Sequence, residues 1–242
     1  MTSETRASFY ALRPGGWRDY VTLLHVPYTL WHLSYVVIGA ALAPEWLPGR
    51  LGAALVAFAL ALGVGAHALD ELRGRPLATR ISDRVLWLLA AASITAAVGI
   101  GIAAALAWWP WLLAFVAFGG FIVVAYNLEL FGGRFHSDLW FALAWGALPL
   151  LTAYAAAAET ITRVALAASV FAALLSFAQR RLSTRVRMVR RHVQTVSGTL
   201  GLDDGGTVPI SRELLTRGPE DALRALTAAT IALAVALVLL RV

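Results

Sequence analysis

The amino-acid sequence predicts an all-α integral membrane protein with about seven transmembrane helices. Hydrophobic residues make up 60% of the 242 residues, charged residues only 14%, and the mean hydropathy is +0.72, far from the composition of soluble globular proteins. The chain has no cysteine, which excludes disulfides, thiolate catalysis and cysteine-ligated metals. We predict a cytoplasmic N-terminal segment, 1–19, with no cleavable signal, and a single transmembrane domain, 20–242.

Each predicted helix is an apolar segment long enough to cross the hydrocarbon core. Between the third and fourth segments the chain reads "AWWPW", where tryptophans flank a proline as in an interfacial aromatic belt around a tight turn. The seven segments are approximately 20–43, 51–71, 84–107, 110–127, 138–157, 161–182 and 222–241.

The distribution of arginine predicts the orientation of these helices. All 20 basic residues are arginine, and with a cytoplasmic N-terminus 17 of them fall in the tail and in the loops after the second, fourth and sixth helices. Only Arg50, Arg163 and Arg241 fall on the other side. Because positive segments resist translocation, we expect a multi-pass plasma membrane protein with its N-terminus inside. The net charge of +6 then reflects topology and membrane lipids, with no nucleic-acid partner.

The sixth helix is expected to continue beyond the membrane as a basic cytoplasmic extension, followed by a loop, over about 183–220. The glycines and proline of "SGTLGLDDGGTVPIS" end this extension. Ser211 or Thr216 is expected to start the last helix, with Pro219 in its first turn.

A polar cluster marks the cytoplasmic end of the second helix. His67, Asp70 and Glu71 are spaced three and four residues apart, so they project from one face of a helix. One interpretation is that the two acids mark the helix end and pair with nearby arginines. The other is that they hold a divalent cation bridging to phosphate oxygens, while the arginines that follow, Arg73, Arg75 and Arg80, bind the anion directly.

Three segments in order resemble the UbiA-type polyprenyltransferase superfamily. "LLHVPYTLWHLSYVVIGAALA" is similar to its first helix, and "GAHALDELRGRPLATRIS" lies where that superfamily has its first aspartate-rich motif. "AYNLELFGGRFHSDLWFALAWGALP" is similar to its segment entering the fifth helix. The resemblance covers about residues 18–160 and implies a UbiA-like helical bundle, in a shortened, divergent member.

The motifs match only in part. Asp70 matches the second aspartate of the first motif, whereas Ala66, His67 and Gly74 stand where the superfamily has Asn, Asp and Asp. The second aspartate-rich motif is replaced by "FAQRRLSTRVRMVRR", and the next acids are Asp203 and Asp204. Seven predicted helices also fall short of the usual nine.

The resemblance implies transfer of a prenyl group from an isoprenoid diphosphate to a hydrophobic or aromatic acceptor. It implies that Asp70 and Glu71, with His67 as a nitrogen ligand, hold Mg²⁺, and that Tyr126 and Asn127 orient the acceptor. The implied diphosphate-binding residues are Arg73, Arg75, Arg80, Arg134, Arg180 and Arg181. The alternative is an isoprenoid- or phospholipid-binding membrane protein, non-catalytic or differently catalytic, that has lost the two-metal chemistry; Tyr126 is then an ordinary interfacial tyrosine. Neither reading fixes the oligomeric state.

The histidines suggest a different kind of site, one that binds haem or a transition metal. His25 and His32 lie two turns apart on one face of the first helix and, with His67, could ligate haem or a transition metal within the bundle. The sequence favours the simpler account, in which buried histidines are hydrogen-bonded to hydroxyl groups.

Overall fold

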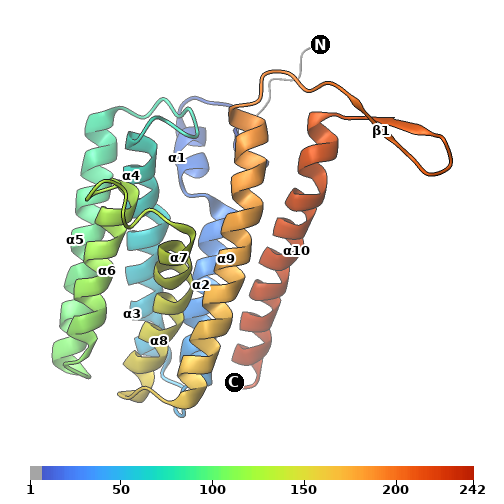
Figure 1. The fold of residues 1–242 in the computed structure, drawn as a ribbon. Helices are drawn as coiled ribbons and strands as arrows, with labels where there is room; N and C mark the ends of the chain where they lie inside the picture. The colour runs from blue at the N-terminus through green and yellow to red at the C-terminus, as the bar shows by residue number, and fades with distance from the viewer. Residues whose placement is uncertain (1–6) are drawn as a thin grey trace.

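The computed structural model describes residues 7–242 and shows a bundle of helices that run side by side (Figure 1). Within this range, five helical stretches are long and apolar enough to cross a membrane, and the bent pair α1 (Trp17–Leu23) and α2 (Val26–Leu42) makes a sixth. A shorter apolar helix, α6 (Leu112–Asn127), has 16 residues. The prediction of an all-α membrane protein is therefore supported at this level.

The second, third and fifth predicted segments are matched closely. The second segment is one continuous stretch, Pro48–Leu72, and the fifth is another, Asp138–Ala158. Both contain a π-helix, a rare form in which hydrogen bonds join residues five apart and which is frequent at functional sites. The elements are α3 (Pro48–Phe58), η1 (Ala59–Ala66), α4 (His67–Leu72), α5 (Asp83–Ala107), α7 (Asp138–Phe141), η2 (Ala142–Ala147), α8 (Leu148–Ala158), α9 (Arg163–Arg191), β1 (Thr199–Gly201), β2 (Thr207–Pro209) and α10 (Arg212–Leu239).

Hydroxyl side chains begin four of these helices. Ser82, Ser137, Thr162 and Ser211 each accept a hydrogen bond from the backbone N–H three residues further on. This is the usual N-cap arrangement, and it satisfies a donor that the first turn leaves free. Ser211 therefore begins the last helix, and Pro219 lies inside α10 rather than in its first turn.

The first and last segments differ from expectation, and the helix predicted at 222–241 begins ten residues earlier, at Arg212. The segment predicted at 20–43 is broken at His25, where α1 and α2 meet at an angle of 45°. The basic extension of the sixth segment is confirmed as helix, since α9 runs to Arg191. The stretch after it forms a β-hairpin, which the sequence analysis did not predict; it places Asp203 and Asp204 in its turn.

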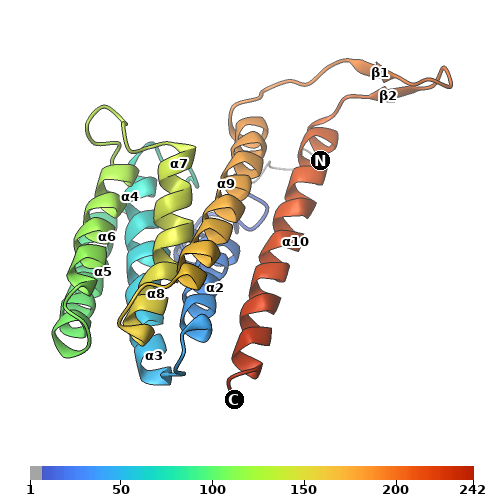
Figure 2. The ribbon, with the colours of Figure 1, turned by 60° about the horizontal axis from the view of Figure 1, so that its bottom comes forward.

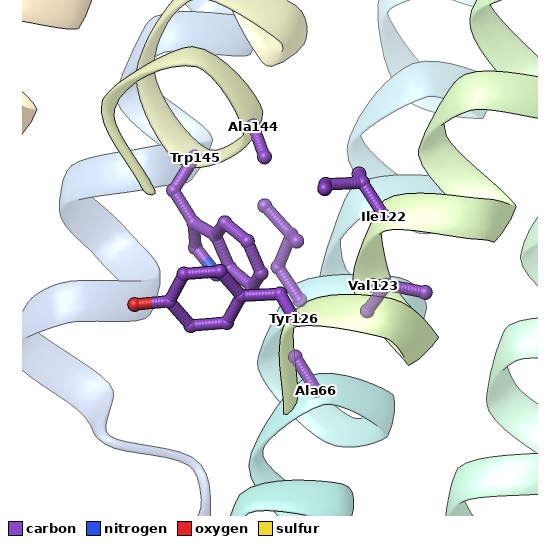
Figure 3. Close-up of a cluster of buried hydrophobic side chains, with 7 residues drawn as sticks. Ala66, Ile122, Val123, Tyr126, Ala144 and Trp145 are labelled. Carbon is purple, nitrogen blue, oxygen red and sulfur yellow. The ribbon is translucent and has the colours of Figure 1, made fainter. Parts of the chain in front are cut away.

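The core lies between α2, α8, η2, α9 and α10. Trp31 and Tyr35 are fully buried there, and the indole N–H of Trp31 donates to the Tyr35 hydroxyl at 2.5 Å. A second cluster, shown in Figure 3, packs Val123 and Tyr126 of α6 against Trp145 of η2 and Ala66 of η1. The loop after α4, the loop after α6 and the hairpin lie at one end of the bundle, opposite the end of α10 (Figure 1).

Candidate functional site

A polar cavity of about 380 Å³ lies at the end of the bundle that carries the hairpin. Its walls come from α9, from the break between α1 and α2, from the end of α4, from the loop after α6 and from residues 8–10. The charged side chains that line it are Asp70, Arg73, Glu129, Arg180, Arg187 and Arg191. With four arginines and two acids, the cavity is suited to an anion.

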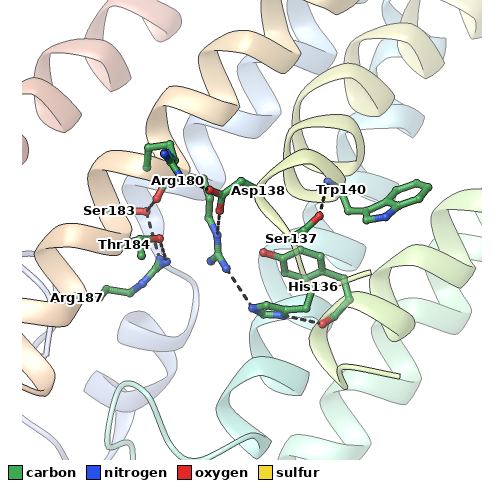
Figure 4. Close-up of polar contacts among 10 residues, drawn as sticks. His136, Ser137, Asp138, Trp140, Arg180, Ser183, Thr184 and Arg187 are labelled. Carbon is green, nitrogen blue, oxygen red and sulfur yellow. Dashed lines mark hydrogen bonds and ion pairs between the residues drawn. The ribbon is translucent and has the colours of Figure 1, made fainter. Parts of the chain in front are cut away.

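Arg180 is the most firmly positioned of these cations (Figure 4). Its Nη2 donates to Nε2 of His136 at 3.1 Å, and its Nε lies 3.4 Å from a carboxylate oxygen of Asp138. Its guanidinium also lies 5.8 Å from the ring centre of Tyr126 and 5.5 Å from that of Phe141. The α6–α7 connection and α7 thus hold an α9 arginine in place at the cavity wall.

Arg187 and Arg191 follow Arg180 along α9 and line the same cavity. Arg187 donates to the Thr184 hydroxyl at 2.9 Å and the Ser183 hydroxyl at 3.3 Å, both one turn back. Arg191 donates to the carbonyl of Ala7 and the hydroxyl of Ser8. Because the partners of both guanidiniums are neutral, their positive charge is not cancelled by these contacts.

The segment just before α1 forms another wall of the cavity, through Ser8, Phe9 and Tyr10. The Tyr10 hydroxyl lies 3.0 Å from Nδ1 of His25, and the guanidinium of Arg224 lies 4.9 Å from the ring centre of Phe9. Burial raises the pKa of Tyr10 to about 12, against the lowering effect of Ser8 and Arg191. This contribution was not expected of the predicted cytoplasmic segment 1–19; the aromatic pair Phe9 and Tyr10 was the signal for it in the sequence.

His25 has a left-handed backbone conformation, with φ 45° and ψ 47°, which is uncommon for a residue other than glycine. Its ring stacks on that of His67 with the centroids 4.0 Å apart, and Nδ1 of His67 donates to the carbonyl of Gly63 at 3.1 Å. Within residues 7–242 no three His, Asp or Glu side chains are grouped so as to hold a metal ion.

Asp70 and Glu71 lie in different surroundings although they are adjacent. Asp70 lines the cavity, whereas the Glu71 carboxylate is fully buried against the loop after α4. There it accepts hydrogen bonds from the backbone N–H groups of Leu77 and Thr79, at 3.0 and 2.8 Å, and from the Thr79 hydroxyl at 2.9 Å. Of the three proposed metal ligands, only Asp70 lines the cavity. His67 does not line it but stacks on His25, which does.

The other arginines expected at the site are divided between the cavity and the surface. Arg73 lines the cavity and pairs with Glu129 at 2.8 Å. Arg75 pairs with Asp83 and donates to the carbonyl of Ile81, which closes the loop after α4. Three others are exposed and are not part of the cavity lining: Arg80, Arg134 and Arg181, the last pairing with Asp138 at 3.1 Å.

The two residues expected to orient an acceptor are both buried. The ring of Tyr126 lies between His136 and Trp145, with centroid distances of 4.4 and 4.6 Å. Figure 3 shows it beside Trp145, and its hydroxyl has no hydrogen-bond partner among the described residues. Asn127 donates to the carbonyl of Val123 at 2.6 Å, one turn back in α6. Tyr126 therefore supports the wall that holds His136 and Arg180, and Asn127 ends its helix.

Comparisons of the chain with protein-family models, with curated proteins and with solved structures found no match. The assignment of a function therefore depends on the cavity and its charged residues.

Proposed function

We propose that this chain binds an isoprenoid diphosphate, with the diphosphate in the polar cavity and the prenyl chain in the membrane. The observation that carries the proposal is the convergence of Arg73, Arg180, Arg187 and Arg191 on one cavity at the end of an apolar helical bundle. Guanidinium groups form charge-assisted hydrogen bonds with phosphate oxygens, which are stronger than neutral ones.

The proposed topology has seven transmembrane segments, with α6 and the bent pair α1 and α2 each counted as one, and a cytoplasmic N-terminus. The cavity then opens on the cytoplasmic face of the plasma membrane. Support comes from the arginine distribution, since Arg50, Arg163 and Arg241 belong to the end opposite the cavity. An isoprenoid diphosphate made in the cytoplasm reaches such a site from the inner leaflet.

The proposed reaction is prenyl transfer to a hydrophobic or aromatic acceptor, as the resemblance to UbiA-type enzymes implies. In this reaction the bond between the prenyl carbon and the diphosphate oxygen breaks, and the carbon bonds to the acceptor, which loses a proton. The four arginines would stabilise the negative charge that develops on the leaving diphosphate. Mg²⁺ is commonly held by one or two carboxylates together with substrate phosphates, so Asp70 is the residue that would hold it, supplying further charge neutralisation.

Calorimetric titration of the detergent-purified protein with geranylgeranyl diphosphate tests the binding. Arg187→Ala removes a cavity arginine, and Arg185→Ala removes an exposed arginine from the same helix as a matched control. Since a hydrogen bond to a charged group contributes about 1.5–3 kcal/mol, the first variant should weaken binding by roughly 10- to 100-fold and the second should bind like the wild type. Equal effects of the two variants would refute a site in this cavity.

A second candidate function is binding of a lipid phosphate without prenyl transfer. It is favoured by one observation: the α9 side of the cavity carries three arginines, beside Ser183 and Val186, and contains no acid. The same titration in EDTA separates the two functions. Binding that needs Mg²⁺ and is lost in Asp70→Asn supports the transferase, whereas binding that survives both changes supports a metal-free lipid site.

A further inference from the structure

Residues 7–11 form a short segment, with neither helix nor strand, that lines one side of the polar cavity. In Figure 2 the blue start of the described chain emerges between α9 and α10, and the contacts agree with this view. Arg191 of α9 donates to the Ser8 hydroxyl at 3.3 Å. The guanidinium of Arg224, in α10, lies 4.9 Å from the ring centre of Phe9. The segment therefore closes the side of the cavity that lies between these two long helices.

The base of this segment is fixed to α1. The N–H of Leu12 donates to the Thr22 hydroxyl at 3.0 Å, and the N–H of Gly15 donates to a carboxylate oxygen of Asp19 at 2.9 Å. Both acceptors belong to α1 and are buried. Because residues 7–11 extend beyond this base, they can swing about it without unwinding a helix or separating a strand.

Side-chain contacts hold the far end of the segment against the bundle. Arg191 donates through Nε to the carbonyl of Ala7 at 3.2 Å, in addition to its contact with Ser8. The Tyr10 hydroxyl lies 3.0 Å from Nδ1 of His25, at the break between α1 and α2. Each such contact contributes little net free energy, because water replaces it when it breaks. Segments held in this way belong to the parts of a protein that open most readily.

Arg191 connects the segment to the contents of the cavity, which its side chain also lines. Its contacts with Ala7 and Ser8 are made through Nε and Nη2. A guanidinium has five N–H donors in a fixed fork, so the same group can hold the segment through one edge and an anion through another. An anion bound there fixes the guanidinium and strengthens its other hydrogen bonds. By linkage, the closed segment in turn favours the bound anion.

We propose that residues 7–11 are a lid that closes the cavity over a bound diphosphate, with Arg191 as its latch. The proposal rests on the proposed function, since the diphosphate is the ligand that the lid encloses. In the closed form Phe9 and Tyr10 are part of the cavity wall and Ala11 is buried. The ligand enters while the segment is open, and its binding favours the closed form.

Because the chain has no cysteine, a single introduced cysteine reports on the position of the lid. Ala11 is 3% exposed, so the thiol of Ala11→Cys reacts with a water-soluble methanethiosulfonate when the segment opens. Ala68→Cys, fully buried in α4, is the matched control that the lid does not cover. Modification rates are measured on the detergent-purified proteins with and without geranylgeranyl diphosphate, and again in the presence of Arg191→Ala. Matching helical circular dichroism of the variants controls for folding.

We expect the diphosphate to slow modification at residue 11 several-fold, and Arg191→Ala to speed it several-fold without any ligand, with no change at residue 68. A rate at residue 11 that neither change affects would show a fixed wall and overturn the lid. Faster modification with the diphosphate would show that the ligand displaces the segment, and would also overturn it.

Calorimetry of the same proteins separates the lid from the proposed function. Heat of diphosphate binding without slower modification would overturn the lid alone. Absence of binding heat would refute the proposed ligand, and faster modification in Arg191→Ala would then still support a lid latched by this arginine.

Discussion

His136 accepts a hydrogen bond from Arg180 through Nε2, at 3.1 Å, while its Nδ1 donates to the carbonyl of Tyr126 at 3.0 Å. A carbonyl oxygen can only accept, so the proton lies on Nδ1 and the lone pair on Nε2 faces the guanidinium. The backbone of α6 thereby sets the tautomer of His136, and His136 sets the direction of a cavity arginine. His136 is a positioning residue that sequence analysis did not identify.

His136→Ala should weaken binding of geranylgeranyl diphosphate by up to about tenfold, because a neutral hydrogen bond contributes about 0.5–1.5 kcal/mol. Arg180→Ala should weaken it more. If His136 acts through Arg180, the double variant should bind no more weakly than Arg180→Ala, as a double-mutant cycle by calorimetry measures. Additive losses would show that His136 acts on its own.

Replacing Glu71 should lower stability, whereas replacing the adjacent Asp70 should change ligand binding. Glu71→Ala leaves three buried donors without a partner and should lower the free energy of unfolding by about 3 kcal/mol or more. Asp70→Asn, at the cavity wall, should change it by less than about 0.5 kcal/mol and should alter binding instead. Denaturant unfolding of the two purified variants measures the difference, and equal stability losses would contradict these assignments.

Tyr10 should make stability fall in alkaline solution. Its pKa is raised from 10.0 to about 12 by burial, so the folded protein keeps the phenol proton where the unfolded chain loses it. This contribution is fully present below pH 10 and is lost as the pH rises through about 12. Tyr10→Phe should show a shallower loss of stability between these values than the wild type does. Parallel unfolding curves at each pH would exclude the effect.

Gly146 should tolerate no side chain. A Cβ atom there would lie 2.5 Å from the carbonyl oxygen of Ala172 and 2.8 Å from the hydroxyl of Ser176, so η2 and α9 would have to separate. Gly146→Ala should lower stability by about 1–3 kcal/mol, the usual effect of overpacking. Gly99, on α5, has open space around it and is the matched control; Gly99→Ala should be neutral or stabilising by about 0.5–1 kcal/mol, which thermal unfolding can distinguish.

The helices were largely predictable because apolar length alone defines a segment that crosses a bilayer. The predicted segments 84–107 and 138–157 differ by one residue at an end from Asp83–Ala107 and Asp138–Ala158. The break at His25 was not predictable, since no glycine marks it and Pro27 is placed as any proline in a first helical turn is. The hairpin was missed because its strands have three residues each, too few to show a periodic pattern.

The candidate site was predictable in part. Asp70, Arg73 and Arg180 were singled out from the sequence and line the cavity. Helical spacing placed Glu71 on the same face as Asp70, but α4 ends at Leu72 and the loop turns back over Glu71, which changes what its carboxylate meets. The part played by residues 8–10 depends on a contact with Arg191, more than 180 residues away in the chain, which no local pattern reports.

Arg241 bears on the order in which the protein assembles. Its guanidinium donates to the carbonyls of Ala41 and Ala43, at 2.7 and 2.5 Å, at the C-terminal end of α2. Ala234 packs in one cluster with Trp31 and Tyr35 of that same helix. During synthesis α2 therefore lacks part of its partner surface until α10 has been made. Because these contacts join residues about 200 positions apart, we expect the packing of α10 against α2 to be a late step in folding.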